Sequence, residues 1–190
     1  MSHILLIDYN LAVSKQRNRN KTKNLICLAL YTLMQKQDYE EISVKDICQR
    51  AGVSRMSFYR YYGMKDDIFI TYCDERFEEF YTRVSKEKGL SMKEFTLKMF
   101  EFIDEYKRQI LILYSAHRES LLLEQLNSYA RYIISTLKTD TFDEQKNNPV
   151  FAFFMAGGLF NTISYWLNMK NPLSPKEIND VLYNAIRKEQ

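Results

Sequence analysis

Histidine, cysteine, glycine and proline are scarce in this chain of 190 residues, which has 2 His, 3 Cys, 5 Gly and 3 Pro. The sequence has no cluster of Cys and His at metal spacing, no Gly-rich phosphate loop and no G-x-S-x-G turn. Cys27, Cys48 and Cys73 are dispersed, so we expect reduced core thiols, with oxidation sensing as the weaker alternative because buried thiols are usually inert. We therefore expect no enzyme, no metal site and no cofactor.

Long apolar runs are also few, which argues against a membrane protein. The opening run Ile4–Ile7 is short and follows no basic segment, so it is neither a signal peptide nor a membrane span. The stretch Val150–Met169 is longer, but polar residues such as Asn161 and Thr162 interrupt it, and we expect a helix buried on two faces. The sequence therefore predicts a cytoplasmic protein without membrane contact.

Apolar residues recur every three or four positions over most of the chain, which is the period of an α-helix. Ser91 with Glu94, and Ser174 with Glu177, have the spacing of capping boxes, each of which starts a helix. A polar stretch at 138–148 separates two expected helices and is the best candidate for disorder. We expect an all-α fold.

Residues 42–65, ISVKDICQRAGVSRMSFYRYYGMK, are the most informative segment of the chain. Ser43 can cap a first short helix, and Asp46 can close the capping box. Gly52 can take the positive φ of a sharp helix exit, and Ser54 can cap a second short helix. Two short helices joined by a tight turn form a helix-turn-helix, a unit that reads DNA.

The second of these helices has an apolar side and a polar side. Stepping about 100° per residue places four side chains within an arc of roughly 140°: Arg55, Met56, Tyr59 and Arg60. Phe58 points to the opposite side. An arginine can donate two hydrogen bonds to guanine, and a tyrosine hydroxyl can reach a phosphate oxygen. Met56 can make an apolar contact of the kind that a thymine methyl offers.

Positive charge is concentrated at one end of the chain. Residues 1–65 hold 11 Lys or Arg against 5 Asp or Glu, a balance of +6, while residues 66–190 hold 16 against 19, a balance of −3. Five of these cations lie just ahead of the first expected helix: Lys15, Arg17, Arg19, Lys21 and Lys23. Such an arm can neutralise phosphates, so we expect DNA binding to weaken steeply with salt, although a merely solvated tail is the alternative.

The run from Asn24 to Ile68 resembles the N-terminal domain of the TetR family of bacterial transcriptional regulators. The shared positions, at fixed spacings, are Ala29, Tyr39, Ile42-Ser43-Val44, Ile47, Ala51-Gly52-Val53-Ser54, Phe58-Tyr59, Tyr62 and Lys65. Three positions depart from the family pattern: Asp38 replaces a usual glycine, Tyr61 a common histidine, and Met64 a common Ser or Asn cap. The Met64 departure leaves Gly63 as a weaker cap for the next helix.

The resemblance implies three parts: a flexible basic arm at 1–20, a three-helix helix-turn-helix domain at 21–65, and a larger helical bundle at 66–190 for dimerisation and ligand binding. It also implies the DNA contacts, with Tyr59 and Lys65 mainly on phosphate. The expected DNA-binding residues are Ser43, Lys45, Ser54, Arg55, Met56, Ser57, Tyr59, Arg60, Tyr61 and Lys65.

The C-terminal segment, about residues 150–187, has a weaker resemblance to the same family, in which the last two helices of each subunit form a four-helix interface. This implies a homodimer on a palindromic operator in double-stranded DNA. Gly157 and Gly158 cost about 1 kcal/mol each in helix propensity, a loss that close contact with another helix can offset. The expected interface residues are Phe151, Phe154, Gly157, Gly158, Thr162, Trp166, Ile178, Val181, Leu182 and Ala185.

Aromatic and methionine residues between the two ends could line a cavity, although stripes at helical spacing are more often plain core. The resemblance implies an effector, and these residues would suit an apolar or aromatic small molecule. The candidate pocket residues are Tyr72, Phe95, Met99, Phe102, Tyr106, Tyr114, His117, Phe154, Met155 and Trp166.

Together these patterns predict a sequence-specific DNA-binding regulator, most simply a ligand-responsive repressor that acts as a homodimer. The alternative is a TetR-like co-activator or adaptor that works mainly through protein–protein contacts. The high aromatic content and the unusual first 14 residues leave room for that alternative. No residue decides between repression and activation.

Overall fold

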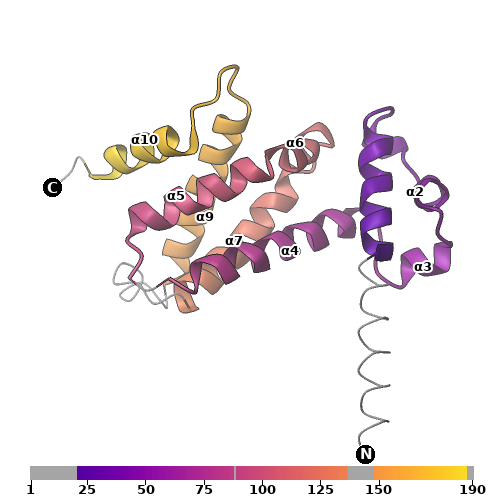
Figure 1. Ribbon diagram of the computed structural model, residues 1–190, viewed down its shortest axis with the longest axis horizontal. Helices are drawn as coiled ribbons and strands as arrows, with labels where there is room; N and C mark the ends of the chain where they lie inside the picture. The colour runs from indigo at the N-terminus through magenta and orange to yellow at the C-terminus, as the bar shows by residue number, and fades with distance from the viewer. Residues whose placement is uncertain (1–20, 88, 137–147, 188–190) are drawn as a thin grey trace, which may run out of the picture. The chain divides into compact units, whose positions relative to one another are not determined.

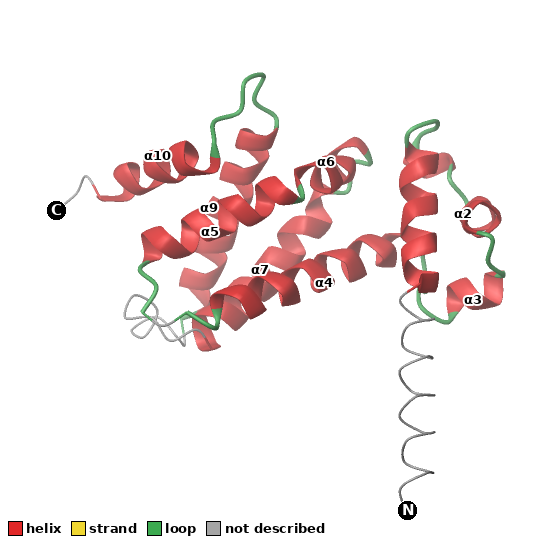
Figure 2. Ribbon diagram, viewed as in Figure 1, coloured by secondary structure: helices red, strands yellow, loops and turns green. Residues whose placement is uncertain are grey.

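The structure is a computed structural model that describes residues 21–87, 89–136 and 148–187, and the secondary structure of that part is helical throughout (Figures 1 and 2). The all-α prediction is therefore confirmed. The predicted arm at 1–20, and all of the predicted loop at 138–148 except Asn148, lie outside the described residues. The chain divides into two compact units, residues 1–69 and residues 70–190.

The smaller unit has its own hydrophobic core. Its elements are a first helix described over 21–34, the 3-10 helix η1 at Tyr39–Glu41, α2 at Val44–Ala51 and α3 at Arg55–Tyr59. Ile26 and Leu30, four residues apart on the first helix, are fully buried, as are Ile47 of α2 and Phe58 of α3. One buried stripe per helix is what the apolar spacing predicts, and the helix-turn-helix prediction is confirmed.

The described part of the larger unit contains most of α4, which runs over Asp66–Val84, and five further helices. These are α5 at Met92–Glu105, α6 at Lys107–Ser115, α7 at Glu119–Thr136, α9 at Pro149–Leu167 and α10 at Pro175–Arg187. Within this unit α7 packs along α9, and α5 packs along α10 (Figure 1). The capping boxes predicted for α5 and α10 are both present, with Ser91 and Ser174 accepting hydrogen bonds from the backbone N–H groups of Glu94 and Glu177.

Trp166 of α9 lies at the centre of the larger unit's core. It is 1% exposed, its ring meets Phe100 of α5 edge to face at 5.5 Å, and its Nε1–H donates to the Leu173 carbonyl oxygen at 2.7 Å. The indole thus satisfies its polar group while burying its large apolar surface. The sequence places Trp166 in both the dimer interface and the pocket, but the structure places it inside one chain.

A polar pair is buried between α5 and α10. The Thr96 hydroxyl donates to Oδ1 of Asn179 at 2.6 Å, and Nδ2 of Asn179 donates to the Lys93 carbonyl oxygen at 3.1 Å. Both side chains are buried, so these bonds replace the water that the groups lose on folding. The pair favours one register of α10 on α5, because a shift along the helix would leave the buried Asn179 amide unpaired.

The turn ahead of α4 is held to that helix by hydrogen bonds that the sequence did not predict. Asp67, in the first turn of α4, reaches back so that its Oδ2 accepts hydrogen bonds from the N–H groups of Gly63 at 2.7 Å and Met64 at 3.1 Å. These bonds satisfy N–H groups just ahead of α4, which a Ser or Asn at position 64 would not reach, and the negative charge of Asp67 in the first turn suits the helix dipole.

Candidate nucleic-acid interface

The turn between α2 and α3 is built by local hydrogen bonds. The Ser43 hydroxyl accepts from the Asp46 N–H at 3.2 Å while the Asp46 carboxylate accepts from the Ser43 N–H at 3.0 Å, a complete capping box. Gly52 ends α2 with φ of 66°, in the left-handed region that a residue with a Cβ rarely adopts. The Val53 N–H then donates to the Cys48 carbonyl oxygen at 3.0 Å, which fixes the exit angle of the chain.

The position of α3 is set by one buried side chain and one cap. Ser54 accepts a hydrogen bond from the Ser57 N–H at 3.1 Å, and Phe58 is fully buried with its ring 5.5 Å from that of Tyr62. Because α3 has only five residues, this anchor determines which of its faces is buried. The opposite face is left open.

The open face of α3 carries the side chains that the sequence analysis grouped. Arg55, Met56, Tyr59 and Arg60 are all exposed. The Ser57 hydroxyl lies 3.0 Å from that of Ser54, so both serines are partly engaged in capping. Tyr61, at the end of the segment, is half-buried against Tyr62. The structure therefore gathers two guanidinium groups, one phenol and one thioether on a single surface, which we call the α3 face.

The remaining expected DNA contacts lie elsewhere. Ser43 and Lys45 are exposed at the start of α2, although the Ser43 hydroxyl already contacts Asp46. Lys65 differs most from the prediction, because its side chain is turned inward and is 19% exposed. Its ammonium donates to the carbonyl oxygens of Tyr39 at 2.6 Å and Ile42 at 3.2 Å. These bonds complete η1, so the position of Lys65 is explained without a phosphate.

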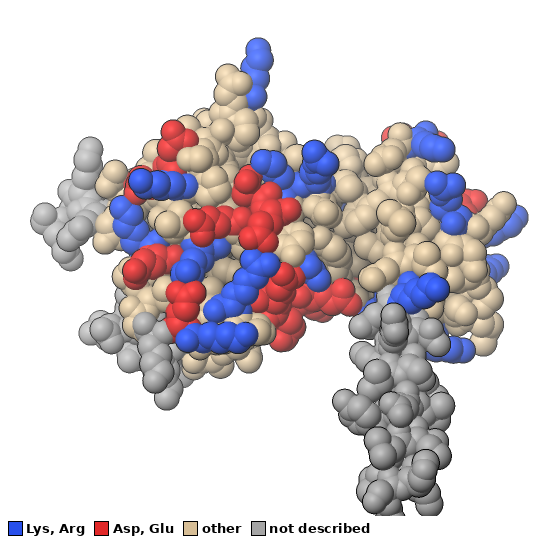
Figure 3. Space-filling view, viewed as in Figure 1, with Lys and Arg blue, Asp and Glu red and all other residues tan. Residues whose placement is uncertain are grey.

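Charge differs between the two units on the face drawn in Figure 3. The smaller unit shows Lys and Arg with few acidic residues, whereas the larger unit shows both signs close together. Ion pairs of the larger unit include Lys93 with Asp180 and Lys98 with Glu87. A surface of paired charges has little net attraction for phosphate, so the cationic surface belongs to the smaller unit.

The candidate pocket residues do not form one cluster. Phe95 and Met99 are buried in the core, Phe102 is partly buried against it, and Trp166 is inside it, whereas His117 and Phe154 are exposed. Met155 is half-buried, and the Tyr114 hydroxyl lies 2.5 Å from that of Ser164 on α9. Burial raises the pKa of Tyr114, so its hydroxyl stays protonated. Four of the ten candidates therefore belong to the core or pack against it, and the pocket stays a prediction for the others.

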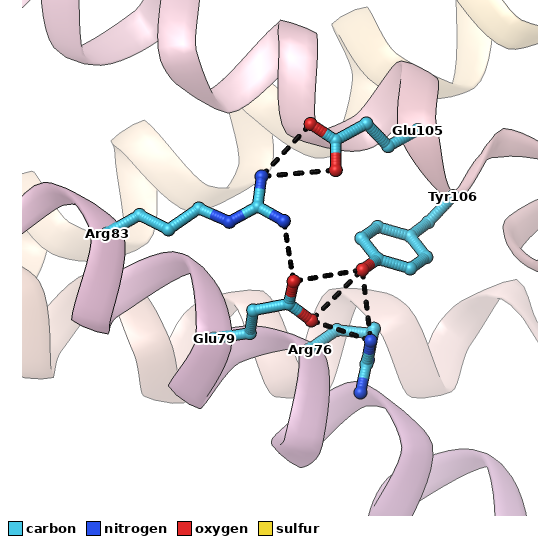
Figure 4. A network of polar contacts seen from close by, with 5 residues as sticks. All are labelled: Arg76, Glu79, Arg83, Glu105 and Tyr106. Atoms are coloured by element: carbon cyan, nitrogen blue, oxygen red, sulfur yellow. Dashed lines mark hydrogen bonds and ion pairs between the residues drawn. The ribbon is translucent and has the colours of Figure 1, made fainter.

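Tyr72 and Tyr106 do come together, around a residue that the sequence analysis did not single out. The Arg76 guanidinium lies 5.4 Å from the Tyr72 ring centroid and 5.0 Å from that of Tyr106. One of its terminal nitrogens, Nη1, bonds to Glu79 at 2.6 Å and to the Tyr106 hydroxyl at 3.0 Å (Figure 4). Its buried Nε has no hydrogen-bond partner. The spacing of apolar residues along α4 does not predict this cluster, because Arg76 is a charged residue beside the apolar stripe.

Glu79 links this group to a second arginine. Burial opposes ionisation of Glu79, but hydrogen bonds from Arg83 and Tyr106 outweigh it and hold the pKa of Glu79 below its usual range. Arg83 also donates to both carboxylate oxygens of Glu105, at 3.0 and 3.1 Å, and thereby joins α4 to the end of α5 (Figure 4). The network neutralises two arginines with two glutamates.

The expected dimer residues divide into a buried and an exposed set. Ile178 and Trp166 lie in the core, whereas Phe154 is 74% exposed and Val181 and Ala185 are also exposed. Phe151, Thr162 and Leu182 are half-buried. A Cβ added at Gly157 or Gly158 would meet no atom of the described chain within 4 Å. By length and composition alone α9 could cross a membrane, a test that core helices also pass, and α9 packs along α7 here.

Metal sites are not indicated in the part of the chain that the structure describes, where no three His, Cys, Asp or Glu residues lie together as a possible set of ligands. Cys48 is buried, while Cys27 and Cys73 are half-buried. Burial raises the pKa of Cys73 to about 12, so its reactive thiolate form is disfavoured.

Two family models match the chain. The model described as "Bacterial regulatory proteins, tetR family" matches residues 27–72, and the model described as "Transcriptional regulator C-terminal region" of the same family matches residues 91–188. No curated protein matches the sequence.

Several solved structures share the fold. A TetR transcriptional regulator from Streptococcus agalactiae is 18% identical, with a TM-score of 0.62 over 92% of this chain and 98% of that one. The protein Lin0861 from Listeria innocua is 14% identical, with a TM-score of 0.76 over 90% and 92%. The dihydroxyacetone kinase operon activator DhaS is 21% identical, with a TM-score of 0.56 over 87% and 93%.

Proposed function

Because this chain belongs to the tetR family of bacterial transcriptional regulators and has its DNA-binding helix-turn-helix, we propose that it controls transcription by binding a palindromic operator as a homodimer. The observation that carries the proposal is the α3 face. Arg55 and Arg60 can each donate two hydrogen bonds to guanine in the major groove, and Tyr59 can donate to a phosphate oxygen. Such a regulator would act in the cytoplasm, where its operator is.

The homodimer is supported by an uncovered apolar stripe along α9. Val150, Phe154 and Tyr165 are each more than 70% exposed, and their spacing puts them on one side of the helix together with Gly158. Large apolar side chains so exposed are unfavourable in water and are typical of a protein–protein interface.

Gly158 makes a second copy the fitting partner for this stripe. Neither a positive φ nor a close contact within the described chain requires a glycine there, yet glycine costs about 1 kcal/mol relative to alanine in a helix. A second α9 crossing at Gly158 would use the missing side chain for close approach. The 19 residues of α9 include no charged side chain, so two identical stripes can meet across a two-fold axis without repulsion.

We further propose that an apolar or aromatic small molecule alters DNA affinity, with repression as the effect in its absence. The ligand would act only through a difference in its affinity for the two dimer states. Tyr72 and Tyr106, which flank Arg76, offer aromatic surface and a cation in one place. Activation is the alternative sign, and a reporter gene behind the recovered operator distinguishes the two.

The test is selection of bound fragments from a random duplex pool, repeated with a library of small molecules. We expect a palindromic consensus whose half-sites lie about one helical turn apart. The double variant Arg55→Ala/Tyr59→Ala should lose operator affinity, while the steep salt dependence expected of wild-type binding is measured separately. The matched control is Arg108→Ala/Tyr132→Ala, which removes the same two residue types from exposed positions of the larger unit and should bind as the wild type does.

The second candidate function is an adaptor that works through protein contacts. The exposed aromatic residue Phe153 favours it, because 49% of its surface is accessible and aromatic side chains are enriched at protein–protein interfaces. If the Arg55→Ala/Tyr59→Ala variant keeps full operator affinity at low salt and full activity in cells, the adaptor explanation replaces the one proposed above.

A further inference from the structure

Met56 is the most exposed large hydrophobic residue in the described part of the chain, with 77% of its surface accessible. It lies on α3 directly after Arg55, on the α3 face defined above. A residue of this type is ordinarily placed where it can be covered by other apolar groups. Its exposure therefore calls for a partner outside the chain.

The fold itself does not need the Met56 side chain. The cap at Ser54 and the fully buried ring of Phe58 hold α3 in place. Met56 contributes to the helix through its backbone, where its carbonyl oxygen accepts a hydrogen bond from the Arg60 N–H at 3.2 Å. The side chain can thus be shortened without loss of a core contact. A change in binding caused by shortening this side chain therefore reports on the partner that covers the α3 face.

The chemistry of DNA narrows the identity of that partner. A methionine thioether cannot donate to phosphate, and it competes poorly with arginine for the polar edges of guanine or adenine. In the major groove, one base edge carries an apolar group, which is the C5-methyl of thymine. We propose that Met56 is a specificity-determining residue that selects thymine by packing on this methyl group, an inference that rests on the proposed operator binding.

The proposal makes a statement about the operator as well as the protein. Arg55 and Met56 are consecutive on α3, so the base pair read by Met56 should lie within a step or two of one read by arginine. Each half-site should therefore contain a required thymine beside a required guanine. A polar residue at position 56 would instead read hydrogen-bonding edges and would accept other bases.

Deoxyuridine provides the test, because it differs from thymidine only in lacking the methyl group. Each thymine of the operator recovered by selection is replaced in turn, symmetrically in both half-sites. For the wild type, one such replacement should weaken binding about fourfold per half-site, or about fifteenfold for two, the value of one buried methyl group. The Met56→Ala variant should bind the thymine and deoxyuridine operators equally.

Two controls keep the outcome specific. Met64→Ala shortens another exposed methionine of the same unit and should keep the wild-type preference for thymine. At the sensitive base pair, replacing thymine by cytosine should lower the affinity of the wild type for the operator. Replacing that cytosine by 5-methylcytosine should restore part of the lost affinity for the wild type and none for Met56→Ala. Equal thermal unfolding midpoints of wild type and Met56→Ala would show that the side chain acts on DNA and not on folding.

The results separate this inference from the function on which it rests. A consensus operator whose thymines all tolerate deoxyuridine overturns the role of Met56 and leaves the proposed function standing. A preference for thymine that survives in Met56→Ala overturns it as well. If the wild type recovers no consensus from the pool, both the proposed function and the role of Met56 are wrong.

Discussion

The ammonium nitrogen of Lys65 lies 4.1 Å above the centre of the Tyr39 ring and 2.6 Å from the Tyr39 carbonyl oxygen. The Tyr39 hydroxyl in turn donates to Asp66, the first residue of α4. Two neighbouring residues of the chain thus hold opposite ends of one tyrosine. This arrangement ties η1 to the start of α4 within the smaller unit, and it assigns to Lys65 a role in holding the fold together.

Replacing Lys65 by methionine should destabilise the protein by about 2 kcal/mol, because charge-assisted hydrogen bonds to partly buried carbonyl groups are lost. Thermal unfolding of the free protein measures this change. Lys45→Met is the matched control, since Lys45 is exposed, and it should leave the unfolding midpoint unchanged. If Lys65→Met leaves the unfolding midpoint unchanged and lowers the salt dependence of DNA binding, Lys65 is a phosphate contact and does not stabilise the fold.

Replacing Gly52 by alanine should destabilise the protein by about 1 to 2 kcal/mol, because φ is 66° there and a Cβ is strained in the left-handed region. The cost comes from the backbone alone, since the added Cβ would meet no neighbouring atom within 4 Å. Gly52→Asn should cost less, because asparagine tolerates this conformation better. Chemical unfolding of the wild type, Gly52→Ala and Gly52→Asn measures the three free energies of unfolding. Equal losses of stability for alanine and asparagine would contradict an explanation based on the positive φ.

Replacing Gly158 by leucine should leave the chain folded and dissociate the proposed dimer. Gly158 is exposed and an added Cβ would meet no atom of the described chain within 4 Å, but a leucine there would separate two α9 helices that cross at this point. Sedimentation velocity across a range of protein concentrations measures the association. Ser128→Leu adds the same side chain at an exposed position of α7 and should remain dimeric. A dimer of wild-type affinity in Gly158→Leu places the interface elsewhere.

Replacing Asn179 by alanine should cost roughly 2 kcal/mol, because it removes the buried hydrogen bonds that Asn179 makes with the Thr96 hydroxyl and the Lys93 carbonyl oxygen. Adding Thr96→Val in the same chain should recover part of that loss, since the remaining groups are then apolar. A double-mutant cycle on chemical unfolding gives the coupling between the two side chains. Strictly additive losses would mean that the hydrogen bond does not stabilise the packing of α10 on α5.

The capping box of α5 should make stability sensitive to acid. Hydrogen bonds from the side chain and backbone of Ser91 hold the pKa of Glu94 below its ordinary value of 4.5. As the pH falls, the Glu94 carboxylate is therefore protonated in the unfolded chain before it is protonated in the folded one. The stabilisation by this carboxylate is present above about pH 4.5 and is lost as the pH falls through the pKa of Glu94 in the folded protein. Comparing Glu94→Gln with the wild type from about pH 6 to about pH 3 should show the difference between them shrinking in acid. Glu101→Gln, at an exposed position of α5, should show no such trend.

Local features of this fold could be predicted from the sequence, because their causes lie within a few residues. The capping boxes at Ser43, Ser91 and Ser174, the left-handed Gly52 and the buried Phe58 all depend on neighbours at most four positions away or on helical spacing. The same local logic identified the α3 face, and its exposure in the structure agrees with that prediction. Its contacts with DNA stay a prediction.

Features that depend on distant residues could not be predicted in this way. Lys65 is separated by 26 residues from the Tyr39 carbonyl that it binds, and Arg76 by 30 residues from the Tyr106 hydroxyl. Helical periodicity predicts the direction in which a side chain points but not whether another helix of the same chain covers it. The sequence therefore placed both Trp166 and Phe154 at the dimer interface. One is in the core and the other is in contact with solvent.

The chain has one tryptophan, and its surroundings make it an intrinsic optical reporter. The Trp166 indole is held by the Leu173 carbonyl in the connection between α9 and α10, so its emission responds to the solvent exposure of that connection. Fluorescence of the unlabelled protein can therefore follow any rearrangement of α10, whether an effector, an operator or dilution causes it. No dye or engineered cysteine is required.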